Sequence, residues 1–145
     1  MRSISVLMVL IICGSAPIFS QKLLTWETLT DVKFHQRFSA ELGIEVTEAT
    51  FGNSVKAIEN QQVIIKGFMI PLDPLGTQYV LSKNPMASCF FCGKAGPETV
   101  MELRMHPKSI RRYEMDEVHT FKGILKLNEK DQNALHYIIL DAERM

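Results

Sequence analysis

The stretch VIIKGFMIPLD, residues 63–73, is the most strand-like part of this 145-residue chain. It is rich in β-branched and aromatic residues, which favour a pleated, half-buried backbone. Gly67 stands at its centre, where a bulge or a sharp bend is expected, and Pro71 and Pro74 mark its end. These residues predict a long, strongly bent strand.

Four further segments downstream also predict strands. Residues 99–106, TVMELRMH, alternate between two faces, and residues 119–128, HTFKGILKLN, do the same around a second central glycine, Gly123. Shorter strands are expected at residues 78–82 and 135–143. Five strands, two of them with central glycines, favour a mainly β fold, a small five-stranded OB-like barrel.

The alternation in residues 99–106 divides their side chains between the core and the outside of the barrel. The inward set is expected to be Thr99, Met101, Leu103 and Met105, and the outward set Val100, Glu102, Arg104 and His106. A carboxylate and an imidazole are therefore expected on the same outward face of one strand.

The chain divides into a less regular front part and the barrel, which is expected over residues 63–145. Residues 21–62 predict an irregular N-terminal extension packed on the barrel. Within it, the pattern indicates a helical turn around Trp26, a short strand at residues 32–38 and a short helix in FGNSVKAIEN, residues 51–60.

The first twenty residues have the form of a signal peptide. Arg2 supplies a positive n-region, residues 6–13 form an apolar run too short for a membrane span, and Ser20 offers a small residue for cleavage. We therefore expect an exported protein, periplasmic or secreted. Without residues 1–20 the balance of 16 basic and 16 acidic residues becomes −1, because only Arg2 is lost. A near-neutral charge argues against nucleic acid as a partner.

Cys13 suggests a second interpretation of the leader, attachment to a lipid. A lipoprotein cysteine normally follows a small residue, whereas Ile12 precedes Cys13. Export without a lipid anchor is therefore the favoured interpretation.

The sequence SCFFCG, residues 88–93, carries the other two cysteines. Two intervening residues let both thiolates converge on one soft ion, so this loop predicts half of a zinc or copper site. Further ligands are needed to close such a site. The candidate metal ligands are Cys89, Cys92, Glu98, Glu102, His106 and His119.

Two other interpretations of Cys89 and Cys92 stay open. In an oxidising compartment they can form a structural disulfide, although closing so short a ring removes little loop entropy. They can also act in thiol–disulfide exchange, but this chain lacks the βαβ setting of a thioredoxin-like protein. No Gly-rich phosphate loop, Ser-His-Asp order or pair of catalytic carboxylates stands out, so the sequence does not predict an enzyme.

Several of these segments together resemble the bacterial exported proteins of domain-of-unknown-function family 3299. The resemblance runs from Trp26 to Glu143, and its most particular pieces are KGFMIPLD, residues 66–73, and SCFFCGKAGPE, residues 88–98. It implies an OB-like fold and, because some members are encoded near export or metal-handling transport systems, it favours metal binding, but the family has no settled function to transfer. The alternative function is a non-enzymatic interaction scaffold, accessory to an envelope transport or membrane protein, with Cys89 and Cys92 as a structural disulfide. This chain departs from the commoner family pattern because Cys92 stands where a histidine is usual.

Overall fold

The computed structural model describes residues 22–73 and 77–145. The predicted signal peptide, residues 1–20 with Cys13, lies outside these described residues. Within the described ranges, no helix is long and apolar enough to cross a membrane.

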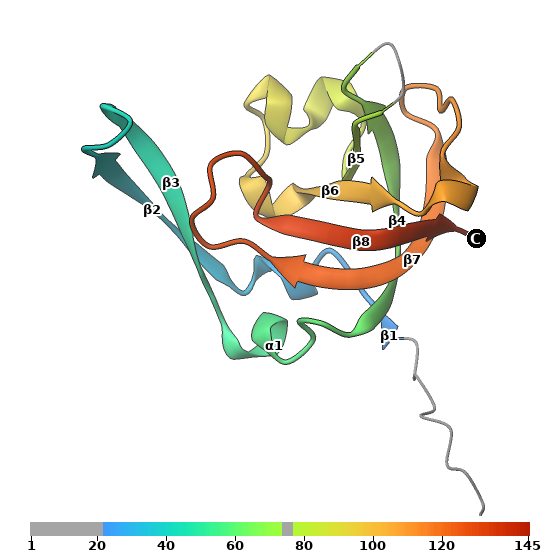
Figure 1. Cartoon of the computed structure of the whole chain (residues 1–145), viewed down its shortest axis with the longest axis horizontal. Coiled ribbons are helices and arrows are strands. Elements are labelled where there is room, and N and C mark those ends of the chain that lie inside the picture. The colour runs from blue at the N-terminus through green and yellow to red at the C-terminus, as the bar shows by residue number, and fades with distance from the viewer. Residues whose placement is uncertain (1–21, 74–76) are drawn as a thin grey trace, which may run out of the picture.

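A closed barrel forms the body of the described chain (Figure 1). The five strands of this barrel are β4 (Gln62–Pro71), β5 (Tyr79–Ser82), β6 (Val100–Met105), β7 (Val118–Leu127) and β8 (Tyr137–Arg144). The order is β4-β5-β6-β8-β7, and β7 pairs back onto β4. Only the β6–β8 contact within this barrel is parallel. This topology confirms the prediction of a mainly β, five-stranded OB-like barrel.

Both central glycines lie where neighbouring strands approach too closely for a side chain. A Cβ at Gly67 would lie 2.6 Å from the carbonyl oxygen of Ser82 on β5 and 2.8 Å from Cγ of Leu81. A Cβ at Gly123 would collide with the side chain of Ile139 on β8. Glycine at these positions therefore permits the close approach that closes the barrel.

The barrel interior is filled by the inward side chains of its strands. On β4 these are Val63, Ile65 and Met69, each at most 1% exposed. The ring of Tyr137 on β8 is fully buried, and its hydroxyl donates a hydrogen bond to the carbonyl oxygen of Leu29 at 2.6 Å. Burial raises the pKa of the Tyr137 phenol above its usual value.

The N-terminal extension packs into the same core as the barrel. Leu29, Val55 and Ile58 are fully buried there. The elements of this extension are β1 (Lys22–Leu23), the 3₁₀ turn η1 (Thr28–Thr30), β2 (Val32–Ser39), β3 (Ile44–Phe51) and α1 (Asn53–Lys56). The predicted turn, strand and short helix are confirmed.

β2 and β3 form an antiparallel hairpin that projects from the side of the barrel (Figure 1). The sequence pattern predicted β2 but not its partner β3. Near the hairpin tip, Phe38, Leu42 and Ile44 are exposed. Its inner half is anchored by Ala49 and Phe51, which are buried in the main core.

Candidate functional site

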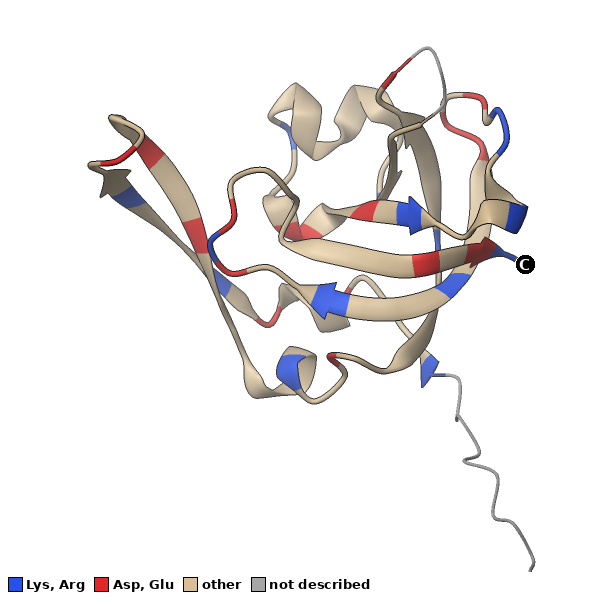
Figure 2. Cartoon of the chain, in the orientation of Figure 1, with Lys and Arg blue, Asp and Glu red and all other residues tan. Residues whose placement is uncertain are grey.

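The predicted cysteine loop joins β5 to β6 and consists of short 3₁₀ turns. These are η2 (Met86–Ser88), η3 (Phe90–Cys92) and η4 (Pro97–Thr99). Gly93 ends η3 with φ of 67°, in the left-handed region that glycine tolerates best. Between Asn84 and Pro97 the only charged residue is Lys94. Figure 2 accordingly shows this loop almost wholly without charge, whereas basic and acidic residues are spread over the rest of the described chain.

The two cysteines of this loop differ in exposure. Cys89 is 0% exposed and lies in a second, smaller core with Ile70, Val80 and Val100. Cys92 is exposed. Both are free thiols. Val100 was expected to face outward, and this expectation is wrong because the cysteine loop covers that outer face of β6.

Met86 contacts both cysteines. The Cys89 thiol lies 3.6 Å from the thioether sulfur of Met86, and the Cys92 thiol donates to the carbonyl oxygen of Met86 at 2.9 Å. Met86 lies in η2 and Cys92 in η3, and the extended backbone of Cys89, with ψ of 179°, separates the two turns. Sequence reasoning missed Met86, although the spacing Met-x-x-Cys-x-x-Cys in residues 86–92 could have indicated it.

The two predicted acidic ligands make other interactions. Glu102 on β6 forms an ion pair with Arg104 at 2.8 Å. The carboxylate of Glu98, in η4, lies against the backbone of Gly96. The charge of Glu98 also adds to the rise in the pKa of Tyr137, which burial mainly causes.

The two predicted histidine ligands are likewise engaged elsewhere. His106 accepts a hydrogen bond from the Lys108 amide at 3.2 Å and so caps a short 3₁₀ turn, η5 (Pro107–Ser109). His119 on β7 lies 3.0 Å from the Glu117 carboxylate, and this hydrogen bond is the main cause of the lowered pKa of Glu117. Across the described residues, no three His, Cys, Asp or Glu side chains converge to hold a metal ion. The predicted six-residue ligand set is therefore not brought together.

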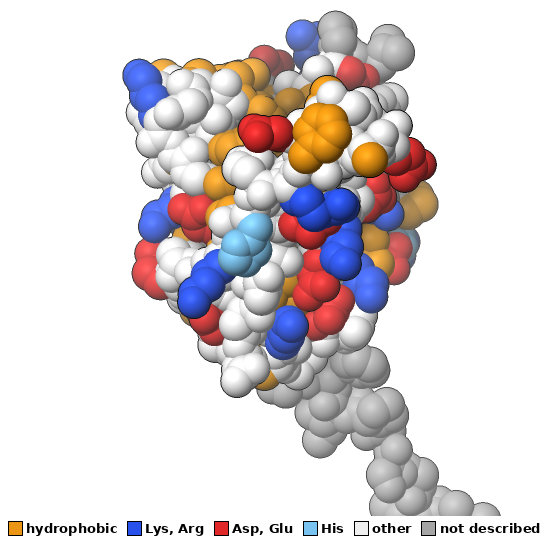
Figure 3. Space-filling model, turned by 90° about the vertical axis from the view of Figure 1, so that its left-hand side faces the viewer, with side chains coloured by type: hydrophobic (Ala, Val, Ile, Leu, Met, Phe, Trp, Pro, Cys, Tyr) orange, Lys and Arg blue, Asp and Glu red, His pale blue; other side chains and the backbone are white. Residues whose placement is uncertain are grey.

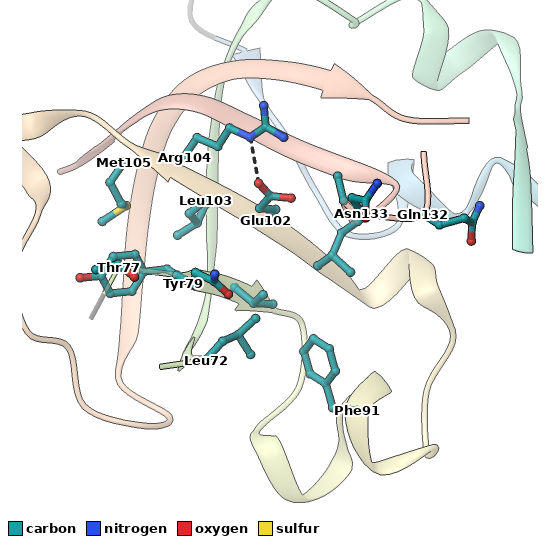
Figure 4. Close-up of a pocket in the computed structure, with 14 residues that line it drawn as sticks. Leu72, Thr77, Tyr79, Phe91, Glu102, Leu103, Arg104, Met105, Gln132 and Asn133 are labelled. Carbon is teal, nitrogen blue, oxygen red and sulfur yellow. Dashed lines mark hydrogen bonds and ion pairs between the residues drawn. The ribbon is translucent and has the colours of Figure 1, made fainter. Parts of the chain in front are cut away.

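A groove of about 400 Å³ lies over β5 and β6, beside the cysteine loop (Figure 4). Leu72 and Phe91 contribute exposed apolar side chains, and the Glu102–Arg104 ion pair lies on the opposite side. Phe91 links the loop to the groove, because its ring packs edge-on against Phe90, which is itself packed on the second core. The β7–β8 connection closes one end of the groove with Gln132, Asn133, Ala134 and Leu135.

Comparisons with protein-family models, curated proteins and solved structures find no match for this chain. The resemblance to family 3299 therefore stays a prediction. The assignment of a function rests instead on the geometry of the cysteine loop and of the groove.

Proposed function

We propose that this protein is an exported, non-enzymatic binding protein that holds a soft metal ion, zinc or copper, through Cys89 and Cys92. The observation that carries this proposal is the contact of both free thiols with one residue, Met86, within one uncharged segment, residues 86–92. The exposure of Cys92 supports it further, because an ion can approach the loop from solvent on that side.

The setting of the cysteines favours metal binding over dithiol exchange. Oxidoreductase cysteines normally lie at the N-terminus of a helix that activates one sulfur. Here Cys89 precedes the three-residue turn η3, which is too short to supply a comparable helix terminus. In addition, Cys89 is fully buried and offers no surface to an incoming disulfide.

Reduced protein, purified from its own compartment, is expected to bind one Zn²⁺ or Cu⁺ per chain, with an affinity that falls as the pH is lowered. The pH dependence follows because thiols must lose their protons in order to coordinate. Metal analysis, run beside a count of free thiols, measures both quantities. A protein that contains no metal, has both thiols oxidised and takes up no ion after reduction would instead have a structural disulfide at Cys89 and Cys92.

A second candidate function is docking to a membrane protein of the envelope, for which the exposed ring of Phe91 in the groove is the specific observation. Phe91 is 41% exposed, whereas Phe90 is packed inward. Figure 3 shows further hydrophobic side chains along the upper part of the hairpin side of the molecule, above a mixture of basic and acidic ones. An apolar area of this kind on an exported protein is typical of an interaction site.

Phe91→Asp is expected to abolish co-purification of an envelope partner, because it places a charge on the apolar side of the groove. Ile110→Asp is the matched control, since Ile110 is 59% exposed and does not line the groove. Chemical cross-linking in the native envelope, followed by recovery of the protein, measures the effect. Equal recovery of the partner with both variants would contradict docking at the groove.

A further inference from the structure

We infer that the thioether of Met86 is the third ligand of the metal site, and that Met86, Cys89 and Cys92 form a three-sulfur centre selective for Cu⁺ over Zn²⁺. This inference rests on the proposed function, because it names the ligand and the ion for the same loop. It replaces the carboxylate and imidazole ligands expected from the sequence with a donor from the loop itself.

The separation of the sulfur atoms of Met86 and Cys89 supports a shared ion. Two sulfur atoms that each bind one ion at about 2.3 Å in a trigonal arrangement lie roughly 4 Å apart. The Cys89 and Met86 sulfur atoms are 3.6 Å apart before any ion is bound. A shift of a few tenths of an ångström therefore suffices to open the space for the ion between them.

The contact of Cys92 with Met86 keeps the third sulfur close to the other two residues. The Cys92 thiol donates a hydrogen bond to the Met86 carbonyl oxygen, with 2.9 Å between sulfur and oxygen. When the proton leaves, this hydrogen bond is lost and the thiolate is free to rotate about its χ1 bond. Because Cys92 is exposed, no packed side chain has to move for this rotation.

The chemistry of the three donors selects the ion. Two thiolates and a thioether are soft ligands, and such sets favour Cu⁺. A structural zinc site normally has four ligands drawn from cysteine, histidine and carboxylate groups. Within the part of the chain that the structure describes, no third group of these types joins Cys89 and Cys92. The loop thus lacks the ligands for a closed zinc site but contains those of a three-coordinate Cu⁺ site.

The surroundings of the loop are suited to such a centre. Cys89 and Met86 border the second hydrophobic core, which keeps water away from one side of the site. Cu⁺ with two thiolates carries one net negative charge. Lys94 is exposed and follows Cys92 by two residues, and its amide donates a hydrogen bond to the Cys89 carbonyl oxygen. Its positive side chain can offset that charge.

Competitive titration of reduced protein, purified from its own compartment, with Cu⁺ and, separately, with Zn²⁺ tests the inference in Met86→Leu. Leucine keeps the volume that packs on the second core but removes the sulfur. Loss of an outer-shell partner already costs about tenfold or more in metal affinity, so loss of a direct ligand is expected to lower the Cu⁺ affinity by at least about tenfold. The Zn²⁺ affinity is expected to be weak and unchanged. Met145→Leu, at an exposed methionine beyond the end of β8, is the control and should leave both affinities as they are.

The outcomes separate the inference from the proposed function. If the unmodified protein binds Cu⁺ and Met86→Leu binds it equally well, the inference is overturned while the two-cysteine site stands. Tighter binding of Zn²⁺ than of Cu⁺ would overturn it in the same way. If the unmodified protein binds neither ion, the proposed function fails first and the inference fails with it.

Discussion

Gly67→Ala is expected to lower the free energy of unfolding by about 3 kcal/mol, the upper part of the usual range for forcing extra volume into a packed site. The added methyl group would lie 2.6 Å from the Ser82 carbonyl oxygen and 3.0 Å from a ring carbon of Trp26. The Ser82 oxygen belongs to the backbone of β5, which is paired with β4 and cannot move aside alone. Denaturant-induced unfolding measures the change.

Gly43→Ala is the matched control for this substitution. Gly43 has φ of 69° at the turn between β2 and β3, and a Cβ there would meet no atom within 4 Å. Its cost is therefore limited to that of the left-handed backbone, about 1 kcal/mol. If Gly67→Ala destabilises the protein no more than Gly43→Ala, the close approach of β4 and β5 does not determine closure of the barrel.

Cys92→Ser is expected to lower the affinity for Cu⁺ by at least about a hundredfold, because it removes a thiolate that binds the ion directly. Its effect on the free energy of unfolding should stay within about 0.5 kcal/mol, since Cys92 is exposed. Chelator competition and denaturant-induced unfolding measure the two quantities on the same protein sample.

Cys89→Ser is the informative comparison, because both the affinity for Cu⁺ and the free energy of unfolding should fall. It removes the other thiolate and also places a hydroxyl group among the apolar side chains of the second core. Burial of an uncompensated hydroxyl costs about 1–3 kcal/mol. Undiminished Cu⁺ binding by Cys92→Ser would show that the ion, if bound, is held elsewhere.

The barrel could be predicted from the sequence because its strands carry local signals. Strand alternation and the mid-strand glycines, Gly67 and Gly123, depend on residues near in sequence and reflect the geometry of a bent strand. Strand β3, residues 44–51, was missed. Its sequence, IEVTEATF, alternates apolar and polar residues in two halves that are out of phase between Thr47 and Glu48, so no single period of two runs through the whole strand.

The contacts of the candidate site could be predicted only in part. Alternation placed Glu102 on an outward face but could not show that Arg104 pairs with it there. Similarly, the burial of Val100 depends on a loop that folds back over β6, a tertiary contact that strand periodicity does not contain. The spacing Met-x-x-Cys-x-x-Cys marks Met86 as a candidate, but the contacts themselves depend on how η2 and η3 are placed relative to one another, which the spacing alone does not determine.

X-ray absorption at the copper edge, on reduced protein loaded with Cu⁺, tests metal binding by the cysteine loop most directly. The predicted result is a first shell of sulfur atoms alone at about 2.3 Å, three per copper. In Cys92→Ser this shell should lose a sulfur or disappear. A first shell dominated by nitrogen or oxygen, or a sulfur shell that is unchanged in Cys92→Ser, would contradict the assignment of the site to Cys89 and Cys92.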